Sequence, residues 1–224
     1  PFEPVREAEP WSVIVHDFRT GVSRVVFKAD RGRGSAFSGL ASPAQLLWSR
    51  DDRLVFAWEK TGWRNLYSIP SAGGAAVNLT PGDHEVEAAT LSNDGAFVLA
   101  VTNAGDIDRR RILRVSPSGA PAPASLTEAG FIDWGAQSTS DGGLAFVRAD
   151  AQMPGRVFVK TASSETKSVS GSLVPQTFPG SLLVTPTAVT FSATDGMKIP
   201  AQLFLPKGLK AGEKRPALIF THGG

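Results

Sequence analysis

The stretch LSNDGAFVL (residues 91–99) is the middle copy of a repeat, because similar stretches lie on either side of it. WSRDDRLVF occupies residues 48–56, and STSDGGLAF occupies residues 138–146. Each copy places an Asp-Asp or Asp-Gly pair before a β-prone apolar run. An Asp side chain can hydrogen-bond the backbone two residues further on, and Gly accepts a positive φ. The pair therefore predicts a tight hairpin turn in each copy.

The spacing of these turns predicts the architecture. Their first acids are Asp51, Asp94 and Asp141, which are 43 and 47 residues apart. A second strand and turn follow each hairpin at a similar offset, and an N-terminal segment has the same half-repeat; these strands are expected at 65–69, 111–115, 156–160 and 12–16. Four short strands in about 40–45 residues are typical of a β-propeller blade.

Residues 1–186 are thus predicted to form an all-β partial propeller of three to four blades, each of about four antiparallel strands. A closed propeller needs at least four blades, so we expect an open arc. No sustained helical period is present through about residue 180. The alternative is an aperiodic β-sandwich, which has similar strand spacing but would not repeat the hairpin at this longer interval.

The sequence changes character in residues 187–224. TAVTFS (187–192), the turn ATDG (193–196) and MKIPAQLFL (197–205) predict a hairpin. PALIFT (216–221) is a continuous apolar run, typical of a strand buried on both faces of an α/β sheet. The segment ends in His222-Gly223-Gly224, and we expect it to be the incomplete start of an α/β-hydrolase domain.

A family resemblance rests on these residues. ATDGMKIPAQLFLPKGLKAGEKRPALIFTHGG (193–224) resembles the junction between propeller and hydrolase in the prolyl oligopeptidase family of serine peptidases. There a D-G hairpin and an L-x-x-P motif precede a strand that ends in H-G-G-P or Y-G-G-P. Residues 58–87 and 91–115 resemble the propeller of the dipeptidyl-peptidase-IV-like branch, in which G-W-x-x-L-Y recurs. The resemblance runs from about Trp11 to Gly224, as a fragment truncated at both ends.

The resemblance implies a parent serine exopeptidase of dipeptidyl-peptidase or acylaminoacyl-peptidase type. Such an enzyme cleaves short peptides near their N-termini through an acyl-enzyme, and its propeller admits only short or unfolded chains. The implied partners are peptide substrates, and a homodimer formed through hydrolase-domain surfaces. A non-catalytic β-propeller binding module is the alternative from another functional class.

The chemistry of an α/β-hydrolase needs a serine on a G-x-S-x-G elbow, followed by an acid and a histidine. The sequence contains no G-x-S-x-G, and its histidines, His16, His84 and His222, all stand at or before the end of the predicted hydrolase strand. We therefore expect the triad to lie outside this chain and the chain itself to be inactive. The resemblance implies oxyanion-hole candidates at Gly224, through its N–H, and at His222, whose position holds a tyrosine donor in the dipeptidyl-peptidase-IV branch; a structural role for His222 stays open.

Weaker motifs have competing interpretations. Asp106 and Asp108 suggest cation ligands, but two acids fall short of the six or more oxygens that calcium takes, so a loop paired with the basic run 109–111 is favoured. The glycine-rich loop 30–35 lacks the G-K-[ST] ending of a phosphate cradle, which favours an inter-strand loop. Residues 78–80 form an N-glycosylation sequon. Three tryptophans are interpreted as blade packing and three charged residues as candidates for the inner face: Trp48, Trp58, Trp63, Glu85, Glu87 and Arg64.

Composition excludes several function classes. Lys and Arg number 23 against 21 Asp and Glu, which gives a net charge of +2 and no concentrated basic face for nucleic acid. The absence of cysteine excludes disulfides, thiolate zinc sites and a cysteine nucleophile. No apolar stretch approaches the ~20 residues of a membrane span, and no signal peptide is recognisable. We expect no cofactor or metal, and a periplasmic, secreted or cytoplasmic location stays open.

Overall fold

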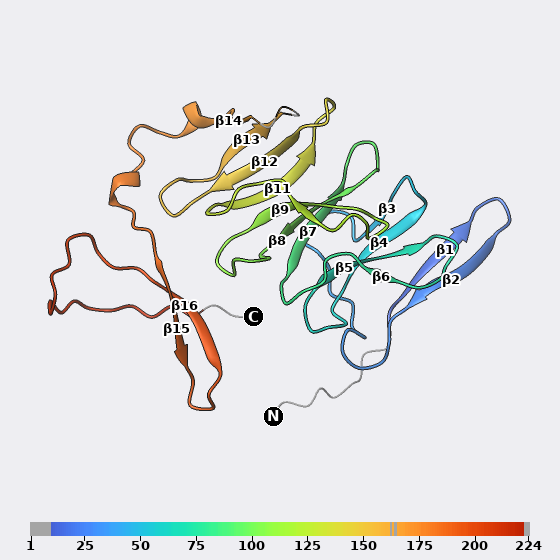
Figure 1. Ribbon diagram of the computed structural model, residues 1–224, viewed down its shortest axis with the longest axis horizontal. Helices are drawn as coiled ribbons and strands as arrows, with labels where there is room; N and C mark the ends of the chain where they lie inside the picture. The colour runs from blue at the N-terminus through green and yellow to red at the C-terminus, as the bar shows by residue number, and fades with distance from the viewer. Residues whose placement is uncertain (1–9, 162, 164, 222–224) are drawn as a thin grey trace. The chain divides into compact units, whose positions relative to one another are not determined.

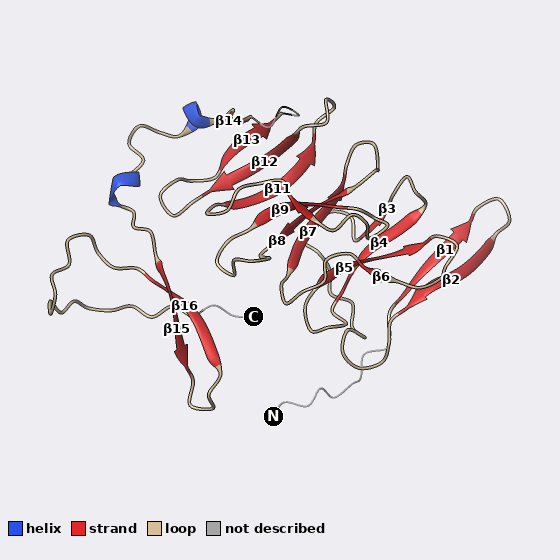
Figure 2. Cartoon of the chain, in the orientation of Figure 1, coloured by secondary structure: helices blue, strands red, loops and turns tan. Residues whose placement is uncertain are grey.

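The computed structural model describes residues 10–161, 163 and 165–221. Its contacts divide the chain into two units, one of residues 1–150 and 154–176 and the other of residues 151–153 and 177–224. Strands are the main regular secondary structure, and the helical elements of the described residues are two short 3-10 turns, η1 (Gly171–Leu173) and η2 (Gly180–Leu182) (Figure 2).

The first unit contains three four-stranded antiparallel sheets and one two-stranded sheet, in which each strand pairs with its neighbour in sequence (Figure 1). The two-stranded sheet is β1 (Ser12–Asp17) and β2 (Val22–Lys28). The first full sheet is β3 (Leu46–Trp48), β4 (Arg53–Trp58), β5 (Asn65–Pro70) and β6 (Val77–Asn78). The second is β7 (Val86–Leu91), β8 (Val98–Thr102), β9 (Arg111–Val115) and β10 (Ala124–Ser125). The third is β11 (Ile132–Ser138), β12 (Leu144–Ala149), β13 (Arg156–Lys160) and β14 (Thr166–Ser168). Each full sheet is one blade, so the predicted partial β-propeller is confirmed.

The repeated turns form as predicted. The second residue of each Asp-Asp or Asp-Gly pair has a positive φ, namely 57° at Asp52, 67° at Gly95 and 81° at Gly142. The N–H of each donates to the carbonyl three residues earlier, which closes the turn. Successive turns also contact one another, because the Arg50 N–H donates to the Gly95 carbonyl at 3.0 Å. The turn that repeats about every 45 residues therefore closes the hairpins and also supplies part of the contact between blades.

The apolar cores lie between blades. In β4, Leu54, Phe56 and Trp58 face the β1–β2 sheet, while Val55 and Ala57 face the second blade. In β8, Val98 and Ala100 face the first blade, and Leu99 and Val101 face the third. Successive strand side chains point to opposite faces, so a middle strand with both faces covered is apolar at nearly every position.

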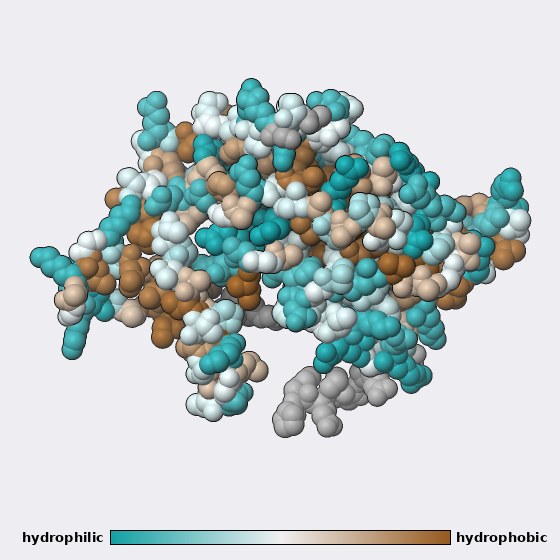
Figure 3. All heavy atoms as spheres, viewed as in Figure 1, coloured by the Kyte–Doolittle hydropathy of each residue, from teal (hydrophilic) through white to brown (hydrophobic). Residues whose placement is uncertain are grey.

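The second unit holds one hairpin, β15 (Thr187–Ser192) paired with β16 (Lys198–Leu203). Its turn has Gly196 at φ 85°, and the Asp195 carboxylate accepts the Met197 N–H, as the D-G signal predicts. The predicted strand at 216–221 is not formed, because no described strand lies beside it to supply ladder hydrogen bonds. Leu218, Ile219 and Phe220 are 94%, 88% and 84% exposed. Hydrophobic surface is visible over this unit in Figure 3.

Candidate functional site

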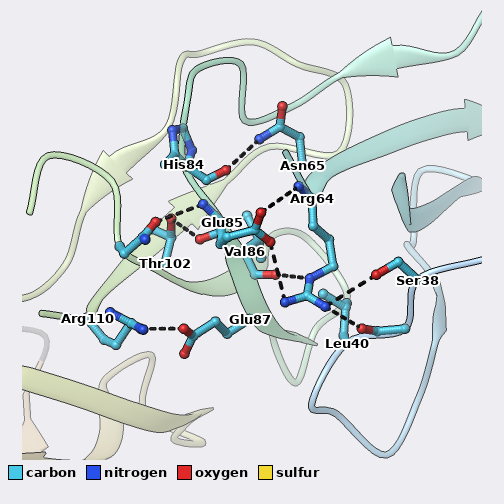
Figure 4. Close-up of polar contacts among 12 residues, drawn as sticks. Ser38, Leu40, Arg64, Asn65, His84, Glu85, Val86, Glu87, Thr102 and Arg110 are labelled. Atoms are coloured by element: carbon cyan, nitrogen blue, oxygen red, sulfur yellow. Dashed lines mark hydrogen bonds and ion pairs between the residues drawn. The ribbon is translucent and has the colours of Figure 1, made fainter. Parts of the chain in front are cut away.

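A polar cluster surrounds the start of β7, the first strand of the second blade (Figure 4). We call it the β7 cluster; it comprises Arg64, Glu85, Glu87 and Arg110. Arg64 stands just before β5, and its guanidinium reaches two other segments. It donates to the Val86 carbonyl through Nε at 3.0 Å and to the Gly39 carbonyl through Nη1 at 3.0 Å. It also pairs with Glu85 at 3.4 Å. One side chain therefore links the β4–β5 connection of the first blade to the start of β7 and to the loop before β3.

Glu85 is held on its other side by the end of β8. Its backbone N–H donates to Asn103 Oδ1 at 2.8 Å, and its carbonyl accepts the Thr102 hydroxyl at 2.7 Å. One Glu85 carboxylate oxygen also accepts the Arg64 backbone N–H at 3.3 Å. The carboxylate is consequently fixed in place and neutralised by Arg64.

Glu87 lies at an irregularity in β7, where the pairing with β8 shifts register between Val86 and Ala88. Its carboxylate accepts Arg110 Nε at 2.5 Å. The Arg110 carbonyl in turn accepts the Asp133 N–H at 3.0 Å, which ties this ion pair to the third blade. The β7 cluster therefore contains two carboxylates and two guanidinium groups, and its charges balance.

A cleft of about 330 Å³ adjoins Glu87. It is lined by residues 41–43 of the loop before β3, by residues 87–90 of β7, by Leu99 and Val101 of β8, and by residues 134–137 of β11. The first strands of two blades, each at the edge of its sheet, thus form its walls.

The sequence named Glu85, Glu87 and Arg64 as candidates for the inner face of the propeller, and that placement stays a prediction. Glu85 directly precedes β7 and Glu87 lies within it, and Arg64 lies beside Glu85. Sequence reasoning missed Arg110 and the cleft. The signal for the cleft was Gly135 inside an otherwise strand-like segment, since such a glycine often marks a bulge.

His84 precedes the cluster and is partly buried. Its Nε2 is buried without a hydrogen-bond partner among the described residues, and its carbonyl accepts the Asn65 amide. Burial lowers the pKa of His84 below its ordinary value of 6.5, although the nearby carboxylates of Glu85 and Asp83 oppose the shift. The imidazole is therefore neutral at pH 7.

We expect acid to destabilise the protein in part through His84. Because the folded chain binds this proton less readily than the unfolded chain, the free energy of unfolding should decrease as the pH falls through about 6.5. Urea unfolding at pH 7.5 and 5.5 should show a smaller decrease in a His84→Gln variant than in the wild type. Equal decreases in the two proteins would contradict this role of His84.

The remaining sequence motifs have structural roles. The Asp106 carboxylate accepts the Asp108 N–H and pairs with Arg109 at 3.0 Å, as the loop interpretation predicts. In the glycine-rich loop, the Gly34 carbonyl accepts the indole N–H groups of both Trp11 and Trp58. That loop is an inter-strand connection fixed by tryptophans.

The sequon is also built into a blade. The Asn78 amide donates to Tyr67 Oη at 3.2 Å, and its oxygen accepts the Thr80 N–H at 3.0 Å.

Of the tryptophans, Trp58 is buried in the core, as predicted. Trp48 is 52% exposed and donates to Asp52 in the repeated turn, so the packing prediction is wrong for it. Its strand β3 has only three residues, and Trp48 is the last of them.

The oxyanion-hole candidates His222 and Gly224 lie outside the described residues. No group of three or more His, Cys, Asp or Glu side chains in the described ranges is arranged to hold a metal ion. Likewise, no helix within those ranges has the length and apolar character that a membrane crossing requires.

Solved structures share this arrangement of blades. The dipeptidyl peptidase 4 of Porphyromonas gingivalis superposes with a TM-score of 0.68 at 12% identity, over 87% of this chain and 28% of its own. A puromycin hydrolase superposes with a TM-score of 0.61 at 17% identity, over 81% and 27%. A puromycin-hydrolyzing peptidase of Mycobacterium tuberculosis gives a TM-score of 0.60 at 17% identity, over 81% and 27%.

The fold is the one found in these peptidases. This chain spans a little over a quarter of the length of each of these structures. No protein-family model and no curated protein sequence matches it. At identities of 12–17% the likeness concerns the fold. The β7 cluster and the cleft belong to the propeller part of that fold.

Proposed function

We propose that this chain is part of a serine peptidase of the prolyl oligopeptidase family, in its dipeptidyl-peptidase-IV-like branch. One observation carries the proposal: propeller blades are followed, in order, by a D-G hairpin, an L-x-x-P motif and an apolar run that ends in H-G-G. The superposition of the blades on a dipeptidyl peptidase 4, a puromycin hydrolase and a puromycin-hydrolyzing peptidase supports it. The exposed apolar run at 218–220 supports it too, since such a run requires sheet neighbours to cover it.

In the parent enzyme, a serine would attack the carbonyl carbon of a peptide bond near the substrate's N-terminus while a histidine takes its proton. The amine would leave with a proton from that histidine, and water would then hydrolyse the acyl-enzyme. The Gly224 N–H or the His222 side chain would donate to the oxyanion in both steps. The triad would lie outside this chain, which alone is therefore inactive.

We propose a structural role for the β7 cluster in this enzyme. Its two carboxylates are each engaged by a guanidinium, so they are not free to hold the amine of a substrate. Arg64 and Arg110 instead hold the loop before β3, the start of β7 and the third blade in one arrangement. The cluster would keep the inner surface of the propeller rigid where a peptide passes.

The test compares this chain with a longer product of its gene. We expect the purified 224-residue chain to release no p-nitroaniline from dipeptidyl or N-acetyl-aminoacyl anilides above the rate in buffer. A longer product that includes a G-x-S-x-G segment should turn these substrates over and react with a fluorophosphonate at the serine. Turnover by the 224-residue chain would overturn its proposed inactivity.

A gene with no G-x-S-x-G after Gly224, or a longer protein without hydrolase activity, would favour the alternative of a non-catalytic binding module. A serine-to-alanine variant of the elbow in the longer protein is the control. Its loss of activity shows that the chemistry is that of the parent enzyme and not of a contaminating peptidase.

A further inference from the structure

The cleft between β7 and β11 is a preformed feature of the blades. Both of its walls are the first strands of their blades, and each carries a bulge at the cleft. The register of β7 against β8 shifts between Val86 and Ala88, and that of β11 against β12 shifts between Trp134 and Gln137. Gly135 lies in the second bulge with φ 65°, a conformation that favours glycine. Bulges are over-represented next to functional sites, where they redirect side chains.

Hydrogen bonds connect the walls of the cleft. The Glu87 carbonyl in the first bulge accepts the Ala41 N–H at 2.7 Å, which fixes the loop that forms one rim. The Ser42 hydroxyl of the same loop accepts the Ala89 N–H at 2.9 Å. Across the cleft, the Thr90 hydroxyl donates to the Ala136 carbonyl at 3.0 Å. The walls are therefore tied to one another.

The lining of the cleft is mainly apolar. Leu99, Val101 and Ala136 belong to the core between the second and third blades, and Ala88 packs against that core. The cleft thus continues this core outward. Glu87 is already paired with Arg110, so neither a cationic nor an anionic ligand would find an uncompensated charge there. Gln137 is exposed at the rim and offers both a donor and an acceptor.

The size of the cleft limits its occupant. Ligand pockets generally measure about 300–1,000 Å³, and this one, at about 330 Å³, lies at the lower end. One bulky side chain with its adjoining amides would fill it. The exposed amide of Gln137 and the backbone of the bulges are suited to the polar amides, and the apolar interior to the side chain.

We propose that this cleft is a pocket for one bulky, uncharged apolar side chain, aromatic or branched aliphatic, of a peptide bound at the inner strands of the propeller. The proposal deepens the peptidase function and, as a statement about substrate, rests on it. The propeller would then contribute to the selection among peptides, through a contact that lies away from the bonds that react.

The test uses the 224-residue chain with N-acetyl amino acid amides as probes. Titrations followed by NMR should show saturable binding of the phenylalanine and leucine amides, with shifts at Ala88 and Thr90 of β7 and at residues 134–137. The glycine, lysine and glutamate amides should bind at least tenfold more weakly. Equal binding of all five amides, or shifts that map elsewhere, would overturn the pocket.

Two variants sharpen the result. Ala88→Leu adds a side chain into the cleft and should weaken binding of the phenylalanine amide at least tenfold. Ala201→Leu is the matched control, because Ala201 is also half-buried but lies in β16 of the other unit, and it should leave binding unchanged. Should Ala88→Leu fail to fold by circular dichroism, the selectivity and the mapped shifts of the wild-type chain decide the question.

The outcomes separate this pocket from the proposed function. Selective binding at the cleft together with an inactive longer protein would uphold the pocket and overturn the peptidase. An active longer protein whose 224-residue part shows no selective binding would uphold the peptidase and overturn the pocket.

Discussion

Replacing Gly34 with alanine should lower the free energy of unfolding by about 3 kcal/mol, since three costs combine at this residue. Its φ of 77° costs an ordinary residue about 1–2 kcal/mol. An added Cβ would lie 3.0 Å from the Glu59 carbonyl carbon and 2.7 Å from the Trp58 indole nitrogen. Moving the loop away would disturb the two indole bonds to the Gly34 carbonyl, each worth about 0.5–1.5 kcal/mol.

Gly32 supplies a matched control in the same loop. Its φ is 87°, but an added Cβ would meet no atom within 4 Å. Gly32→Ala should therefore cost only the backbone strain, about 1–2 kcal/mol. Urea unfolding curves of both variants measure the difference. Equal destabilisation by the two changes would show that the contacts with Trp11 and Trp58 contribute nothing.

The second large effect is expected at a buried ion pair in the third blade. Arg148 donates to both carboxylate oxygens of Asp133, at 2.8 and 3.0 Å, and the two side chains are 5% and 0% exposed. The guanidinium also lies over the ring of Phe131, 4.1 Å from its centroid. Asp133→Ala would leave a buried charge without its main partner, and should destabilise the protein by about 3–5 kcal/mol.

Glu128 provides the control for that experiment, because it contacts the same guanidinium at 3.3 Å but is 68% exposed. Glu128→Ala should cost no more than about 1 kcal/mol, as exposed ion pairs usually do. Replacing both members, with Asp133→Leu and Arg148→Met, should recover most of the loss. Thermal and urea unfolding measure all three. A small effect of Asp133→Ala would show that water or another group compensates the charge of Arg148.

The sequence predicted the blades well because their signals are local. An Asp94-Gly95 turn and the apolar run after it lie within nine residues, and each copy of this motif became a hairpin. The run at 216–221 shows the limit of this reasoning. Its apolar character predicts a buried strand, but a strand forms only beside another strand.

The candidate site was less accessible to sequence reasoning. Glu85, Glu87 and Arg64 could be named from the sequence as charged candidates for the inner face, but they could not be placed, because their contacts join segments that lie far apart in the chain. Arg64 binds the carbonyl of Gly39, 25 residues away, and Glu87 binds Arg110, 23 residues away. Such contacts depend on how blades pack, which no local pattern specifies. The bulge at Gly135 had a local signal, but its consequence, a cleft, required two strands to meet.

The location of the cores between blades has a consequence for how the protein unfolds. Leu54 and Phe56 lose their burial when the β1–β2 sheet leaves, and Val55 loses its burial when the second blade leaves. A blade therefore has little stability of its own and draws it from its immediate neighbours, as in repeat proteins whose stability is a sum of nearest-neighbour interface terms. Loss of structure would accordingly start at an outermost sheet and spread inward one interface at a time. The cleft between β7 and β11 lies across one such interface, so a peptide bound there would act as a clamp that couples the second and third blades.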